Sequence, residues 1–120
     1  MNYPITRASD GLVVDQLLAL SGAAEEAGSY EAAYHAAMAA LHLADHAGDL
    51  EQVERIARHA LAQELRLEAL SPPHRLAQHA ALRRGTQPLY RNFQVHADAV
   101  RARLGARVEL DRHRAGHPHA

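Results

Sequence analysis

Residues 28–61 read GSYEAAYHAAMAALHLADHAGDLEQVERIARHAL, and this stretch decides the fold. Gly28 and Gly48 each precede a residue that can cap a helix, and alanine and leucine then recur at helical spacing. The segments 28–41 and 48–61 align without gaps and share the glycine, a glutamate, two alanines and the final leucine. We therefore expect two consecutive helices, 30–47 and 50–70, joined by a tight glycine turn.

Three more helices are predicted outside this stretch. The first spans about 11–27, with Asp10 as its N-cap. The next spans about 73–84, after Ser71-Pro72-Pro73, and the last spans about 88–105 and ends at Gly105. The sequence thus predicts an all-α fold, a bundle of about five antiparallel helices in one domain over residues 1–110, followed by a flexible His- and Arg-containing tail over 111–120.

Apolar spacing predicts which face of each helix is buried. Helix 30–47 is apolar nearly all round, as a central helix would be, except for a polar stripe of His35, His42 and His46. In helix 11–27 the predicted apolar face comprises Leu12, Val13, Leu17, Leu18 and Leu20. In helix 50–70 it comprises Leu50, Val53, Ile56, Ala57, Ala60, Leu61 and Leu65. In helix 88–105 it comprises Leu89, Phe93, Ala97, Val100 and Leu104.

Composition excludes several kinds of chemistry. The 120 residues include no Cys and no Lys, which excludes disulfides, zinc–thiolate sites, Schiff-base lysines and the phosphate-binding P-loop. No apolar run is long enough to span a membrane, and residues 1–7 lack the apolar core of a signal peptide, so we expect a cytoplasmic protein with no cofactor. Four serines, Ser21 among them, are expected to serve in caps or turns.

The charges are segregated along the chain. Residues 1–71 carry four Arg against eleven acids, and residues 72–120 carry nine Arg against three acids, although the net charge is only −1. An acidic half and a basic half can attract each other, a second copy or an acidic partner.

The segment 14–44 resembles a tetratricopeptide repeat. The positions that carry the resemblance are Gly28, Tyr30, Ala33, Ala40 and Leu41, which fit the second helix of that repeat. Ser21 stands where the family has Gly, Ala24 where it has an aromatic residue, and the partial copy over 48–61 follows after 20 residues rather than 34. The resemblance implies a helical hairpin that binds proteins or peptides.

Several side chains are candidates for binding. Tyr30, Tyr34 and His35 would line a groove, although Tyr30, Tyr34 and Tyr90 are also typical of packing rings with a hydrated hydroxyl. Arg83 and Arg84 are candidates for contacts with an acidic partner or with phosphates. His42 and His46, spaced i and i+4, offer an alternative metal site.

An enzymatic alternative rests on Arg91 and His96. Their spacing resembles the R-x(4–6)-H motif of HEPN ribonucleases, in which Arg would hold the phosphate and His would act as acid or base. Residues five apart on a helix diverge by about 140°, so such a site would need a dimer. We expect instead a non-enzymatic protein-interaction or scaffold module that uses a helical groove. A second copy is a candidate partner, nucleic acid is the less favoured one, and no membrane is involved.

Overall fold

The computed structural model describes residues 7–70 and 88–116, with side chains from Asp10 onward. It contains four helices, α1 (Arg7–Glu26), α2 (Tyr30–Ala47), α3 (Leu50–Leu70) and α5 (Leu89–Ala115), and no strand within these ranges. The all-α prediction is confirmed. The described residues hold four helices rather than about five, and the helix expected over 73–84 lies outside them.

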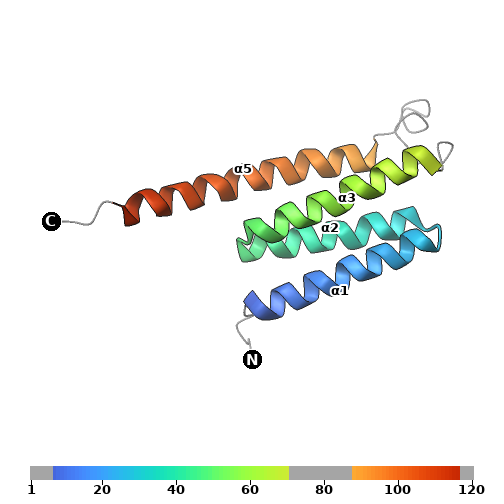
Figure 1. Ribbon diagram of the computed structural model, residues 1–120, viewed down its shortest axis with the longest axis horizontal. Helices are drawn as coiled ribbons and strands as arrows, with labels where there is room; N and C mark the ends of the chain where they lie inside the picture. Colours follow the sequence, from blue (N-terminus) through green and yellow to red (C-terminus); the bar gives the residue numbers. More distant parts are fainter. Residues whose placement is uncertain (1–6, 71–87, 117–120) are drawn as a thin grey trace.

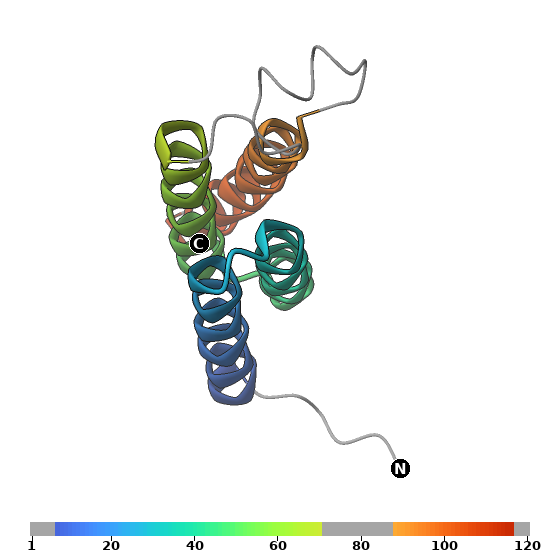
Figure 2. The ribbon, with the colours of Figure 1, turned by 90° about the vertical axis from the view of Figure 1, so that its right-hand side faces the viewer.

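The helices stack as two hairpin-like pairs (Figures 1 and 2). The helix α1 runs antiparallel to α2, which packs on α3, and α3 packs along α5. The helix α2 also contacts α5, so it touches the three other helices and lies at the centre of the packing. That place agrees with its nearly uniform apolar sequence.

Two glycine turns reverse the direction of the chain, one between α1 and α2 and the other between α2 and α3. Gly28 has φ +80° and Gly48 has φ +69°, a region that residues with a Cβ rarely adopt. After each glycine, the next N–H donates back to a carbonyl of the preceding helix, Ser29 to Ala24 at 2.8 Å and Asp49 to Ala44 at 3.0 Å. This is the geometry of a helix ended by a left-handed residue, so both predicted turns are confirmed.

Two predicted helix ends are wrong. The helix α1 begins at Arg7, which places Asp10 inside its first turn rather than at the N-cap. The helix α5 continues through Gly105 to Ala115, ten residues past the expected end. A glycine inside a helix costs only about 1 kcal/mol, and here it has no left-handed dihedral that would end the helix.

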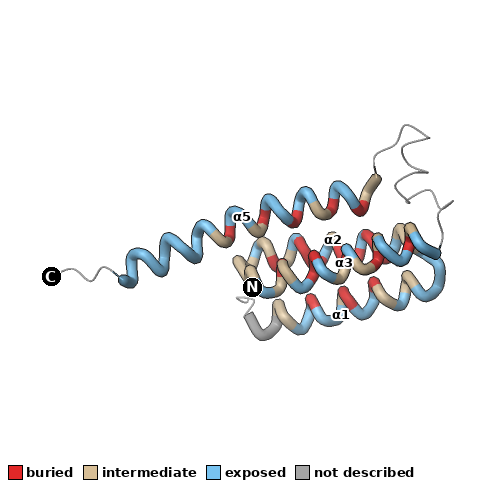
Figure 3. The backbone as a smooth tube through the Cα atoms, turned by 45° about the horizontal axis from the view of Figure 1, so that its top comes forward, coloured by how far each residue is buried: buried red, intermediate tan, exposed pale blue. Residues whose placement is uncertain are grey.

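Buried positions lie on all four described helices (Figure 3), and five of them are alanines of α2. Ala33, Ala37 and Ala40 have no exposed surface, and Ala44 is 1% exposed. Because alanine projects little beyond the backbone, α1 and α3 can approach α2 closely. Larger side chains complete the core: Val14, Leu18, Leu41, Val53, Ile56, Leu67, Tyr90, Phe93, Val100 and Leu104.

The buried faces of α1 and α3 differ from the predicted ones. Leu61 and Leu65 were expected inside α3 but are exposed, whereas Gln63 and Leu67 are buried. The buried residues follow alternating steps of three and four, which brings position 63 inward and turns 61 and 65 outward. In α1 the buried residues are Val14, Leu18 and Ser21, while Leu12, Val13 and Leu20 face outward.

Candidate functional site

A polar network crosses the core and joins α1, α2, α3 and α5. The Ser21 hydroxyl donates to the carbonyl of Ala33 at 2.7 Å, and its oxygen lies 2.8 Å from Nε2 of Gln63 and 3.0 Å from Nε2 of His59. The hydroxyl of Tyr90 donates to Oε1 of Gln63 at 3.0 Å. Ser21 and Gln63 have no exposed surface. The prediction that Ser21 serves in a cap or a turn is therefore wrong. The Tyr90 hydroxyl was predicted to be hydrated, but it is hydrogen-bonded to Gln63 inside the core.

The direction of these hydrogen bonds argues against a Ser–His nucleophile. The hydroxyl proton of Ser21 points to the carbonyl of Ala33, so Nε2 of His59 must donate to the serine oxygen. A general base would have to accept the serine proton instead. Because Ser21 is also fully buried, its hydroxyl is closed to solvent, and the network holds the four described helices together.

Burial shifts the titration of this network away from neutral pH. Desolvation lowers the pKa of the His59 imidazole below 6.5, and the nearby Arg66 guanidinium lowers it further. Desolvation also raises the pKa of the Tyr90 hydroxyl, helped by the negative charge of Glu25. Both groups are thus neutral near pH 7, as a buried hydrogen-bonded network requires.

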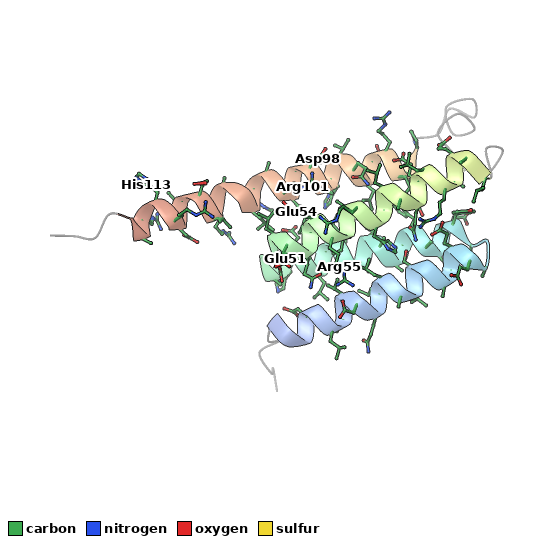
Figure 4. The ribbon with its side chains drawn as sticks, viewed as in Figure 1. Glu51, Glu54, Arg55, Asp98, Arg101 and His113 are labelled. Carbon is green, nitrogen blue, oxygen red and sulfur yellow. The ribbon has the colours of Figure 1, made fainter. Side chains whose placement is uncertain are left out.

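Two ion pairs join α1 to α3. Arg66 binds the Glu25 carboxylate through Nε at 2.6 Å and Nη2 at 2.7 Å, and this hydrogen-bonded guanidinium lowers the pKa of Glu25. Arg55 of α3, labelled in Figure 4, pairs with Asp15 near the middle of α1. Both acids are directed toward α3, so their charges lie away from the opposite side of α1.

That opposite side, the outer face of α1, is exposed and carries no charge. Leu12, Val13 and Leu20 are 59%, 40% and 60% exposed. On α3, by contrast, exposed Leu61 and Leu65 lie among charged side chains. We define the outer face of α1 by its exposed, uncharged side chains together with Ala27 just after the helix: Leu12, Val13, Gln16, Ala19, Leu20, Ala23 and Ala27. Exposed Glu26 borders this face beside Ala19 and Ala23.

A second surface feature is an open depression of about 370 Å³ between α2 and α5. His42 lies against His96 of α5, with ring centroids 5.5 Å apart, and Asp45 pairs with Arg103. Among the described residues, no three His, Asp or Glu side chains are placed to hold a metal ion together. The lining residues are His42, Asp45, His46, Arg103, Leu104 and Arg107.

Arg91 and His96 lie on different sides of α5. The charge of Arg91 acts on Glu64 of α3, whereas the ring of His96 contacts His42 of α2. Both side chains are exposed, and they face different neighbouring helices. Within one chain they do not form the shared cleft that the ribonuclease interpretation needs.

Of the other predicted binding residues, Tyr34 and His35 are in contact, with ring centroids 5.2 Å apart. Tyr34 is buried and makes edge-on contacts with Tyr90 at 5.7 Å and Phe93 at 6.1 Å, so it acts as a packing ring. Tyr30 is half-buried and His35 is exposed. Arg83 and Arg84 lie outside the described residues.

Comparison with known proteins assigns no relationship: no family model, no curated protein and no solved structure matches this chain. In residues 7–70 and 88–116, no helix has the length and apolar character needed to cross a bilayer. Function therefore has to be argued from the surfaces themselves.

Proposed function

We propose that this chain is a non-enzymatic interaction module that self-associates by pairing the outer face of α1 with the same face of a second copy. The observation that carries the proposal is the strip of exposed, uncharged side chains between Leu12 and Ala27. Contiguous apolar surface of this kind is typical of protein interfaces. The stacked hairpins also support the tetratricopeptide-like interpretation, in which helical pairs form a scaffold for protein contacts.

The order of side chains on α1 favours a second copy as the occupant. Val13, Gln16, Leu20, Ala23 and Ala27 follow steps of three and four residues, the spacing of a seam between two helices. Large residues lie at the N-terminal end of this seam and alanines at the C-terminal end. An antiparallel pair centred on Leu20 therefore places Val13 opposite Ala27 and Gln16 near Ala23 of the second copy, with Leu20 facing Leu20 at the two-fold axis.

Electrostatics also permits self-pairing. A dimer through an acidic helix would bring like charges together, but Asp15 and Glu25 are each paired with an arginine of α3. They also point away from the outer face of α1. Pairing this face with itself thus buries apolar surface and leaves the Glu26 carboxylate at the border of the interface.

Cysteine cross-linking tests the pairing, because the chain has no cysteine of its own. The antiparallel arrangement puts Leu20 of both copies near the two-fold axis, so Leu20→Cys should form a disulfide-linked dimer under mild oxidation. Leu65→Cys is the matched control, since Leu65 is 61% exposed on α3 and Leu20 is 60% exposed on α1. Equal cross-linking of the two variants would refute the proposal.

A further inference from the structure

The depression between α2 and α5 concentrates groups that bind anions. His42 and His46 face it from α2, and Arg103 and Arg107 face it from α5. Asp45 is the single carboxylate in the lining, and it is already paired with Arg103. The ion pair holds the Arg103 guanidinium in place and leaves several of its five N–H donors unused.

Arg107 supplies the charge that the depression leaves uncompensated. Its Nη1 atom lies 3.9 Å from the point that a Cβ would occupy at Gly48, so the side chain reaches back to the C-terminal end of α2. Among the described residues, Arg107 forms no ion pair with a carboxylate. The arginine and aspartate side chains of the lining therefore carry one net positive charge.

We propose that this depression binds the phosphate group of a small phosphate monoester. Two guanidinium groups and two imidazoles converge there from two helices, a donor set that matches the several acceptor oxygens of one phosphate. A long polyanion fits less well. The basic side of α5 that carries Arg103, Arg107 and Arg114 is interrupted by Asp111 on the same face.

Titration of the full chain at constant ionic strength tests this site. We expect uridine monophosphate and inorganic phosphate to cause saturable chemical-shift changes at Arg103, Arg107, His42 and His46 in NMR spectra. Arg107→Gln should weaken the binding of uridine monophosphate at least fivefold. Arg112→Gln should leave it unchanged, because Arg112 lies one turn or more beyond the depression and pairs with Glu109.

The outcomes separate this site from other ionic contacts. Equal effects of the two arginine substitutions, or shifts that grow linearly with phosphate, would overturn the proposal. A uridine hexanucleotide without a terminal phosphate is the competing probe. If it binds more tightly than uridine monophosphate, the proposal is overturned in favour of a nucleic-acid surface. The outer face of α1 takes no part in this site, so Leu20→Glu should not alter phosphate binding.

Discussion

Replacing Ser21 with alanine tests whether the core network stabilises the fold. The substitution removes the acceptor of the N–H groups of Gln63 and His59, which lie 2.8 and 3.0 Å from the serine oxygen. A buried donor left without a partner costs about 1–3 kcal/mol, and Gln63 has no exposed surface through which water could replace the serine. We expect Ser21→Ala to lower the free energy of unfolding by about 2–4 kcal/mol and the melting temperature by roughly 10 °C.

Urea unfolding followed by circular dichroism measures this loss. Ser29→Ala is the control, because Ser29 is exposed at the start of α2 and its side chain makes no capping hydrogen bond. That control should change the free energy of unfolding by less than about 0.5 kcal/mol. If the two variants are equally stable, the network does not hold the helices together, and the reasoning from hydrogen-bond geometry is refuted.

Three further predictions concern pH, backbone conformation and the ion pair. Because burial keeps the pKa of His59 below 6.5, the folded chain binds its proton less tightly than the unfolded chain, so stability should fall as the pH drops below about 6.5. His59→Gln should flatten that slope in melting temperatures measured between about pH 5 and pH 7.5, and an unchanged slope would contradict the assignment. Gly105→Ala should raise the free energy of unfolding by about 0.5–1 kcal/mol, since a Cβ there meets nothing within 4 Å, whereas Gly48→Ala should lower it by about 1 kcal/mol because φ is +69°. Urea unfolding checks this prediction: the two substitutions should change the free energy of unfolding in opposite directions. Arg66 lowers the pKa of Glu25, so Glu25→Gln should destabilise the chain at pH 7 by at most about 1 kcal/mol and have no effect well below pH 4.5; a loss that persists in acid would exclude the ion pair as its cause.

The sequence predicts much of this fold because neighbouring residues, above all glycines, determine where the helices begin and end. A glycine precedes the N-cap position of both α2 and α3, and both helices occupy the predicted ranges. The Asp49 carboxylate accepts from the N–H of Gln52 at 3.2 Å, whereas the Ser29 side chain makes no capping hydrogen bond. Ala33, Ala37 and Ala40 are buried where the spacing indicates. The internal repeat holds at the glycines and at Ala40 and Ala60, but Leu41 is buried while its counterpart Leu61 is exposed.

The candidate sites depend on contacts that no local pattern encodes. Gln63 is polar, yet its position continues the buried spacing of Val53, Ile56 and Ala60, and that was the one available signal of a polar group in the core. The inward place of Ser21 follows from partners 38 and 42 residues away in the sequence. The outer face of α1 has no signal of its own in the sequence, because apolar spacing alone does not show which side of α1 packs on α2.

The molar mass in solution tests self-association most directly. The chain of 13.1 kDa should approach twice that mass in sedimentation equilibrium as its concentration rises from about 10 µM to about 1 mM, the range suited to a small helical interface. Leu20→Glu should keep the mass at 13.1 kDa throughout, because it puts a charge at the centre of the outer face of α1, while Leu65→Glu should still dimerise. A wild-type chain that stays monomeric, or a dimer that Leu20→Glu leaves intact, would contradict the proposed pairing.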